Sequence, residues 1–227
     1  MDPKVKLVYF DVQGRGEVAR IILAAGKVEY EDYRVPIPTS IPFPPTSEWA
    51  ILKPRTPFGS LPILYWNGEE IPQSMAIVRF LAKQVGLAGN TDMEFARADT
   101  IVDHTNDFWP KIIPARWAKT QEERVTEANA FLNNFLPDWL SKAENLLKKR
   151  GGLWFSGVGL TFGDIAMEVH LDFITNPGEK AFLGMDNQEE RAIILDSYPL
   201  LKDNFQRVRA VPEIAQWIES RPVFNGL

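Results

Sequence analysis

The stretch from Pro57 to Lys83 constrains the fold of this chain more than any other part of it. Pro62 stands before a short apolar run, residues 63–66, where its missing N–H suits only a strand start or a sheet edge. The pair Asn67-Gly68 is typical of a type I′ turn, in which both central residues need a positive φ. A second short strand, residues 69–71, and an amphipathic helical pattern follow. The stretch therefore predicts a β-hairpin that leads directly into a helix.

Ser74 stands at the start of that helical pattern, and we expect it to be the N-cap residue. The backbone N–H groups at a helix start are unsatisfied and lie at the positive end of the helix dipole. Ser74 and its neighbour Gln73 are therefore also candidates for binding a carboxylate or a phosphate. For this pair of residues alone, simple capping is the favoured interpretation.

The first part of the chain alternates strand and helix patterns. Residues 4–10 predict a strand, because apolar and aromatic residues alternate there without a helix breaker. Residues 16–26 predict an amphipathic helix that closes with Gly26 as its C′ residue. Residues 30–35 predict a second strand, and the helix between the two strands requires a parallel pair. The hairpin then adds antiparallel strands, so the predicted order is βαβ followed by ββα.

A proline-rich segment, residues 36–46, separates these two halves. Five of its eleven residues are proline, a density that excludes a helix or a central strand. The favoured interpretation is a surface excursion of polyproline type, and a segment that covers a site or binds a partner is the alternative. Residues 47–53 predict a short helical turn after it, with Ser47 as the cap.

Strand patterns nearly vanish after residue 86. We expect an amino-terminal domain at residues 1–86, a linker at 87–92 and an all-helical domain at 93–227. Helical periodicity extends over residues 91–117, interrupted at Pro110 and Pro114, and over residues 122–149, where Pro137 predicts a kink. Thr161 and Asp164 have the spacing of a capping box that starts another helix. Shorter helices are expected at residues 188–195, 199–208 and 212–220.

Composition excludes several classes of function. A net charge of −5 and the absence of a long basic run argue against nucleic acid or an anionic membrane as the partner. The sequence contains no apolar run of membrane-spanning length and no signal-peptide pattern at residues 1–10, so we expect a cytoplasmic protein. There is no cysteine, so any sulfur chemistry must use a sulfur that arrives on a substrate. His104 and His170 lack the partners of a metal site or a catalytic triad and are expected to be structural.

The architecture and four motifs together resemble the soluble glutathione transferases over nearly the whole chain. The motifs are a tyrosine-type amino terminus, a Trp-xxx-Lys segment, a hairpin with its helix, and the capping motif of a helical domain. They lie, in order, at residues 8–10 with 14–21, 49–53, 57–64 with 71–82, and 160–166. The resemblance is strongest to the sigma class, which includes a glutathione-dependent prostaglandin D synthase and the S-crystallins. It implies a thioredoxin-like α/β amino-terminal domain (βαβββα) followed by an all-α helical bundle domain.

The resemblance also implies that glutathione is the co-substrate and that Tyr9 and Arg15 are the catalytic residues. A free thiol has a pKa of about 8.5, so an enzyme must favour the thiolate by donating hydrogen bonds to it. The phenol of Tyr9 would donate one, and Arg15 would add a fixed positive charge and a second donor. Without the accompanying motifs, Tyr9 would be interpreted as a core aromatic residue.

Further positions follow from the same resemblance. Gln73 and Ser74 would hold the γ-glutamyl carboxylate, Leu61 would pair with the cysteinyl unit beside a cis Pro62, and Trp49 and Lys53 would bind the glycyl carboxylate. Asp107 would reach the substrate's amino group across a homodimer interface. The full set implied for glutathione is Tyr9, Arg15, Trp49, Lys53, Ser60, Leu61, Pro62, Gln73, Ser74 and Asp107. The set expected to line the pocket for a small electrophile is Phe10, Val12, Gly14, Arg15, Trp109 and Ile113.

Two positions depart from the family pattern, and the function retains alternatives. Ser60 stands where relatives often carry Lys or Gln, and the proline-rich segment is longer than usual. The primary expectation is conjugation of glutathione to electrophiles in detoxification, and the alternative is an isomerase of the prostaglandin D synthase type. An S-crystallin-like structural or ligand-binding protein is a third possibility from another class. No metal is expected, since Asp99 and Asp103 are interpreted as an exposed acidic stripe.

Overall fold

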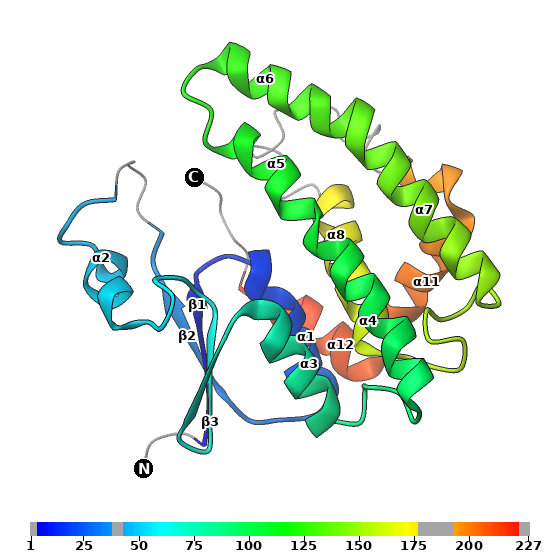
Figure 1. Ribbon diagram of the computed structural model, residues 1–227, viewed down its shortest axis with the longest axis horizontal. Helices are drawn as coiled ribbons and strands as arrows, with labels where there is room; N and C mark the ends of the chain where they lie inside the picture. Colours follow the sequence, from blue (N-terminus) through cyan, green and yellow to red (C-terminus); the bar gives the residue numbers. More distant parts are fainter. Residues whose placement is uncertain (1–3, 38–42, 177–192, 223–227) are drawn as a thin grey trace.

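The computed structural model describes residues 4–37, 43–176 and 193–222. Its amino-terminal part consists of a small sheet with helices on both sides (Figure 1). The elements are β1 (Val5–Phe10), η1 (Gly14–Gly16), α1 (Glu17–Ala25), β2 (Glu31–Val35), α2 (Glu48–Leu52), η2 (Lys53–Arg55), β3 (Ile63–Trp66), β4 (Glu69–Pro72) and α3 (Ser74–Gln84). Every strand and helix predicted for this part is present within one or two residues of its expected bounds.

The sheet has the mixed topology that the sequence predicts. Its strand order is β2-β1-β3-β4, with β1 and β2 parallel and the other two pairs antiparallel. Asn67 and Gly68 have φ values of 52° and 90°, as a type I′ turn requires. Pro72 on β4 pairs with Ile63 on β3. Because β4 is an edge strand, the missing N–H of Pro72 interrupts no hydrogen-bond ladder in the centre of the sheet.

The two faces of the sheet have different partners. Helices α1 and α3 pack together on the face toward the helical domain, and α2 lies on the opposite side (Figure 1). The core between the sheet, α1 and α3 continues into the helical domain through buried residues of its helices, which include Ala98, Val102 and Val169. This core therefore spans both domains, the helical domain has a second core of its own around Phe108 and Trp139, and Tyr9, Trp49 and Leu61 form a smaller cluster on the α2 side.

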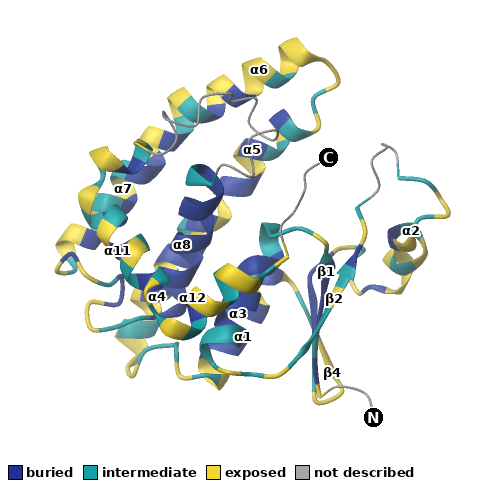
Figure 2. Cartoon of the chain, turned by 180° about the vertical axis from the view of Figure 1, so that it is seen from behind, coloured by how far each residue is buried: buried dark blue, intermediate teal, exposed yellow. Residues whose placement is uncertain are grey.

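The second domain is all-helical, as expected. Its elements are α4 (Asp92–Asn106), α5 (Phe108–Arg116), α6 (Gln121–Ala130), η3 (Phe131–Phe135), α7 (Leu136–Lys149), α8 (Phe162–Thr175), η5 (Ile194–Ser197), α11 (Pro199–Arg209) and α12 (Pro212–Ser220). Helix α8 is buried from Phe162 to Ile174, and the other helices surround it (Figure 2). Of the helix predicted at residues 188–195, the part at 188–192 lies outside the described residues.

The prolines of this domain act in two ways. Pro110 and Pro114 were expected to interrupt the first long helix. The helix is instead interrupted at Asp107, and both prolines lie within the next helix, α5. The interruption at Asp107 leaves Pro110 in the first turn of the new helix, where its missing N–H has no helical partner to lose. Pro137 was expected to kink the second helix. It is the second residue of α7, and the π-helical segment η3 directly before α7 interrupts the regular α-helix at this place.

The carboxylate of Asp164 organises the start of α8. It accepts hydrogen bonds from the N–H and the hydroxyl of Thr161, at 2.9 and 2.8 Å, which confirms the predicted capping box. The same carboxylate accepts from the N–H of Phe155 and the amide of Asn204, both at 2.9 Å. Asp164 therefore anchors the loop before α8 and helix α11 as well as its own helix.

Two predicted caps are wrong. Ser74 is the first residue of α3, and the N-cap is Gln73, whose φ is 74° and whose side chain makes no capping hydrogen bond. Gly26 has a φ of −82°, and the left-handed residue is Lys27, with a φ of 53°. Gly26 is required for packing instead, because a Cβ there would lie 2.3 Å from Cγ1 of Val85 on the turn after α3.

A buried ionic cluster joins the two domains, and we call Glu17, Arg20, Asp172, Trp217 and Arg221 the junction network. Glu17 on α1 contacts the guanidinium of Arg20 at 3.2 Å and accepts from the indole N–H of Trp217 at 2.8 Å. Arg221, after α12, bridges Glu17 at 3.2 Å and Asp172 on α8 at 2.5 Å. The network fixes the first helix against the last one and against the central helix.

Among the helices of the described part, none combines the length and the apolar character that crossing a membrane needs.

Candidate active site

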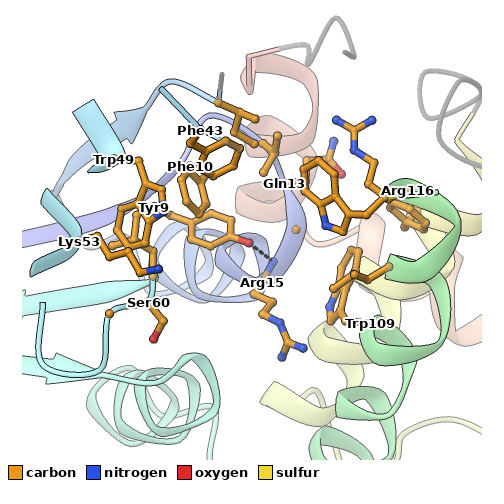
Figure 3. A pocket seen from close by; sticks show the side chains of 18 residues that line it. Tyr9, Phe10, Gln13, Arg15, Phe43, Trp49, Lys53, Ser60, Trp109 and Arg116 are labelled. Carbon is orange, nitrogen blue, oxygen red and sulfur yellow. Dashed lines mark hydrogen bonds between the residues drawn. The ribbon is translucent and has the colours of Figure 1, made fainter. Parts of the chain in front are cut away.

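The side chain of Tyr9 lies near the end of β1, at the floor of a pocket between the two domains (Figure 3). It is 7% exposed, and its hydroxyl oxygen accepts a hydrogen bond of 3.0 Å from the backbone N–H of Arg15. The hydroxyl hydrogen donates to none of the residues that the structure describes. Tyr9 is thus held through its lone pair and keeps its own hydrogen for a ligand.

Two glycines allow the ring of Tyr9 to lie against the following loop. A Cβ at Gly14 would lie 2.7 Å from the Tyr9 hydroxyl, and a Cβ at Gly16 would lie 2.5 Å from Cδ1 of the ring. Gly14 also has a φ of 39°, which disfavours other residues. The short loop from β1 to α1 therefore needs glycine at both positions to bring the Arg15 N–H onto the hydroxyl.

Burial raises the pKa of Tyr9 above its ordinary value of 10.0, and the Arg15 N–H and the charges of Arg20 and Arg15 lower it to a smaller extent. The phenol is therefore protonated at neutral pH. It can donate a hydrogen bond to an anion and cannot serve as a general base there.

Two arginines hold the loop that follows Tyr9. Arg20 is fully buried and donates to the carbonyl of Val12 at 2.6 Å and to that of Phe10 at 3.3 Å. Arg15 reaches the other way and donates to the side chain of Asn106 on α4 at 3.1 Å. The loop is thereby tied to α1 on one side and to the helical domain on the other.

The pocket above Tyr9 has a volume of about 410 Å³ and is mainly apolar. Its lining includes eleven of the residues predicted for the two binding sites: Tyr9, Phe10, Val12, Gly14, Arg15, Trp49, Lys53, Ser60, Leu61, Trp109 and Ile113. Aromatic edges form its walls, with the ring centroids of Phe10 and Trp49 5.2 Å apart and those of Trp109 and Phe173 5.1 Å apart. The structure thus brings together residues from both predicted sets around one hydroxyl group.

Four predicted residues lie outside this lining: Pro62, Gln73, Ser74 and Asp107. The Leu61-Pro62 bond is cis, as the resemblance implies. Gln73 combines exposure with a positive φ, a strained backbone conformation that is found disproportionately at ligand sites. Asp107 is exposed at the junction of α4 and α5.

Seven lining residues were missed by the sequence analysis. They are Gln13, Ile37, Phe43, Gly59, Arg116, Trp117 and Phe173. Ile37 and Phe43 belong to the proline-rich segment, so its interpretation as a surface excursion is wrong for these two residues, while residues 38–42 lie outside the described ones. The alternative interpretation, a segment that covers a site, agrees with the place of these two apolar residues in the pocket wall.

The histidines and the acidic pair have structural surroundings. The ring of His104 stacks on Trp139 with centroids 5.0 Å apart, and burial lowers the pKa of His170 to about 4, so its imidazole is neutral. Asp99 and Asp103 both form ion pairs with Arg79, and a guanidinium therefore lies where a metal between them would sit. Within residues 4–37, 43–176 and 193–222, no group of three or more potential ligands is arranged to hold a metal ion.

Comparison with known families matches both parts of the chain. Residues 5–83 match the glutathione S-transferase N-terminal domain, and residues 106–221 match the glutathione S-transferase C-terminal domain.

Individual relatives extend over nearly the whole length. The chain is 35% identical to the hematopoietic prostaglandin D synthase of Gallus gallus, over 97% of this chain and 98% of the relative. It is 34% identical to glutathione S-transferase 1 of Ascaris suum, with the same coverage of both chains. Among solved structures, a prostaglandin synthase D of Nilaparvata lugens matches with a TM-score of 0.80 and 31% identity, over 98% of this chain and all of that one.

Proposed function

Because the chain belongs to the glutathione S-transferase family, we propose that Tyr9 donates its hydroxyl hydrogen to the thiolate of bound glutathione. The observation that supports this most strongly is the geometry of the hydroxyl group. It is buried at the floor of the pocket, its oxygen is occupied by the Arg15 N–H at 3.0 Å, and its raised pKa keeps the hydrogen in place. A hydrogen-bond donor that is buried and already in position stabilises the negative charge on the glutathione sulfur without having to reorganise.

The guanidinium of Arg15 would also stabilise the glutathione thiolate. It is held by Asn106 at the boundary of the two domains and lines the pocket beside Tyr9. A positive charge in a poorly solvated site lowers the pKa of a neighbouring thiol. We assign both residues to activation of glutathione, with the thiolate as the nucleophile.

The remainder of glutathione would extend from this point toward α2 and α3. Lys53 and Trp49 would bind the glycyl carboxylate, and the backbone of Leu61, beside the cis Pro62, would pair with the cysteinyl unit. Ser60 lines the same side of the pocket. Gln73 and the N–H groups at the start of α3 would hold the γ-glutamyl carboxylate, an assignment that the strained φ of Gln73 supports.

The electrophile would occupy the apolar part of the pocket, between Phe10 and Val12 on one side and Trp109 and Ile113 on the other. Attack by the thiolate on an electrophilic carbon there gives a glutathione conjugate. An isomerase that regenerates the thiolate is the alternative, and the 35% identity to a protein named hematopoietic prostaglandin D synthase supports keeping it. We further propose a sigma-like, cytoplasmic homodimer that acts in detoxification, in which Asp107 would serve the partner's site.

A conjugation assay tests the assignment of Tyr9. One lost hydrogen bond to a charged acceptor costs about 1.5–3 kcal/mol. Tyr9→Phe should therefore raise the pKa of the bound glutathione thiol by about 1–2 units and lower kcat/KM at pH 7 by about 10- to 100-fold. The thiolate is followed by its ultraviolet absorbance as the pH is varied.

Tyr30→Phe provides a matched control. The Tyr30 hydroxyl is buried outside the pocket and has no hydrogen-bond partner within the described part of the chain, so its loss should leave both quantities unchanged. Full activity of Tyr9→Phe would show that the site is misassigned. A wild type that neither conjugates a chromogenic electrophile nor binds immobilised glutathione would favour the S-crystallin-like alternative.

A further inference from the structure

Arg15 connects the floor of the pocket to the helical domain. Its backbone N–H donates to the Tyr9 hydroxyl at 3.0 Å, and its side chain extends from that point into the pocket lining (Figure 3). The guanidinium donates to Oδ1 of Asn106, the last residue of α4, at 3.1 Å. One residue of the loop after β1 therefore contacts both Tyr9 and the helix that begins the second domain.

The acceptor that holds Arg15 is a neutral amide. Within residues 4–37, 43–176 and 193–222, the guanidinium has no other hydrogen bond and no ion pair. The carboxylate of the next residue, Asp107, is exposed and forms no ion pair with it. Five other arginines of the described ranges pair with carboxylates: Arg20, Arg34, Arg79, Arg209 and Arg221. Arg15 is thus held in place without an opposite charge.

The charge of Arg15 reaches the floor of the pocket. Burial is the main influence on the pKa of Tyr9 and raises it, whereas the charges of Arg20 and Arg15 are among the influences that lower it. The guanidinium of Arg20 lies 5.7 Å from the centroid of the Tyr9 ring, but it is paired with Glu17 and Asp32. Arg15 is therefore the cation that acts on Tyr9 with its charge intact.

The remaining charges of the lining leave this arrangement unopposed. Lys53 on η2 and Arg116 on α5 are the other cations of the lining, and Figure 3 shows them on opposite sides of Tyr9. Neither an aspartate nor a glutamate is among the described lining residues. A sulfur bound at the Tyr9 hydroxyl would therefore meet the charge of Arg15 with no acid of the lining to cancel it.

The chemical nature of the side chain at position 106 decides what Arg15 can do. A carboxylate there would hold the guanidinium firmly but would cancel most of its charge. An apolar side chain would leave the charge but release a long side chain with many rotamers. An amide oxygen fixes the guanidinium and leaves its charge available.

We propose that Asn106 is a positioning residue that holds the Arg15 guanidinium beside the glutathione sulfur through a neutral oxygen, so that the positive charge favours the thiolate. The proposal rests on the proposed function, because it assumes that the sulfur lies at the Tyr9 hydroxyl. It adds a residue of the helical domain that controls the charge assigned to Arg15. Activation of the thiol then depends on the contact between the two domains.

Two substitutions separate the position of the guanidinium from its charge. Asn106→Asp keeps the shape and the acceptor but adds a negative charge, and it should raise the pKa of the bound glutathione thiol by about one unit. Asn106→Ala keeps the charge but removes the acceptor, and it should raise that pKa by about half a unit, as loss of an exposed contact predicts. The thiolate is followed by its ultraviolet absorbance as the pH is varied.

The pH profile of conjugation gives a second readout, with 1-chloro-2,4-dinitrobenzene as the electrophile. Below the thiol pKa, kcat/KM should fall about tenfold in Asn106→Asp and about threefold in Asn106→Ala. Both losses should disappear above the raised pKa, because the thiol is then ionised in every variant. A purely structural role of Asn106 would lower the rate equally at all pH values.

A double substitution tests whether Asn106 acts through Arg15. In an Arg15→Met protein, Asn106→Ala should change the thiol pKa by less than about 0.2 unit, because the group that it positions is already absent. Asn129→Asp is the matched control for Asn106→Asp, since it adds the same charge at an exposed position of α6 outside the pocket. It should leave the thiol pKa unchanged.

An unchanged thiol pKa in both Asn106 variants, or an effect of Asn106→Ala that persists undiminished in Arg15→Met, would overturn the role of Asn106. If Asn106→Asp does not fold, salt tests the charge, because the thiol pKa should rise with added salt more steeply in the wild type than in Arg15→Met. A wild type that neither lowers the pKa of bound glutathione nor conjugates the electrophile points to failure of the proposed function instead.

Discussion

Gly16 offers a direct test of how closely the position of the Tyr9 ring controls activity. The φ of Gly16 is −85°, so alanine fits the backbone without strain. Its Cβ, however, would lie 2.5 Å from Cδ1, 2.7 Å from Cγ and 3.1 Å from Cβ of Tyr9. Ordinary contact begins near 3.4 Å. The buried ring must therefore move by roughly 1 Å, a shift of the size that separates a productive from an unproductive geometry.

Two free-energy terms oppose each other in this variant. Overpacking a well-packed site costs about 1–3 kcal/mol. Replacing glycine at a compatible φ stabilises by about 0.4–1 kcal/mol, because the unfolded chain loses freedom. We expect Gly16→Ala to fold with a net loss of about 1–2 kcal/mol. Its kcat/KM should fall by up to about 100-fold, since the hydroxyl leaves its position beside the sulfur.

The assay combines steady-state conjugation, the pKa of bound glutathione and urea unfolding. Gly159→Ala is the control, because no atom lies within 4 Å of its added Cβ. It should leave kcat/KM and the thiol pKa unchanged and should change the free energy of unfolding by no more than about 1 kcal/mol. If Gly16→Ala folds and keeps both the wild-type kcat/KM and the wild-type thiol pKa, the close packing of Tyr9 on its loop does not control the chemistry. The argument from geometry would then be wrong.

Three further changes have defined outcomes. Lys53→Met should raise KM for glutathione about two- to fivefold at an unchanged kcat, as loss of an exposed ion pair predicts, and a KM that does not change would remove Lys53 from the site. Asp164→Ala leaves the N–H groups of Phe155 and Thr161 without their acceptor and should lower the free energy of unfolding by about 2 kcal/mol or more, measured in urea. Burial, above all, raises the pKa of Glu168 from 4.5 to about 8, so this group stabilises the fold below pH 4.5 and loses that contribution as the pH rises through about 8. Unfolding in urea at pH 6, 7 and 8.5 should therefore show a smaller decrease in stability for Glu168→Gln than for the wild type, and parallel curves would contradict the shift.

Local patterns predicted the parts of the fold that depend on neighbouring residues. Asn67-Gly68 makes its turn because both residues tolerate a positive φ, and Thr161 and Asp164 make their capping box because three residues separate them. These are properties of short segments. The order of the predicted elements then sufficed for the architecture, since a parallel pair requires a crossover helix.

The errors concern positions that tertiary contacts decide. The residues next to Lys27 do not indicate that Lys27, and not Gly26, adopts the left-handed conformation. A glycine is needed at position 26 because a Cβ there would clash with Val85, which is distant in the sequence. Arg116 and Phe173 line the pocket only because α5 and α8 face the loop after β1. Apolar and aromatic residues on a helix are equally typical of a buried core, so the sequence alone could not distinguish a pocket wall from a packed interior.

The junction network also has a consequence for biosynthesis. Glu17 is separated by 200 residues from Trp217 and by 204 from Arg221, so the loop after Tyr9 leaves the ribosome long before the residues that hold its helix. At about 5–20 residues per second, the delay is on the order of 10–40 s. During that time Glu17 lacks its contacts with Trp217 and Arg221. A nascent chain can therefore form its sheet early, but it can complete the contacts of Glu17 on α1 only after Trp217 and Arg221 have been synthesised.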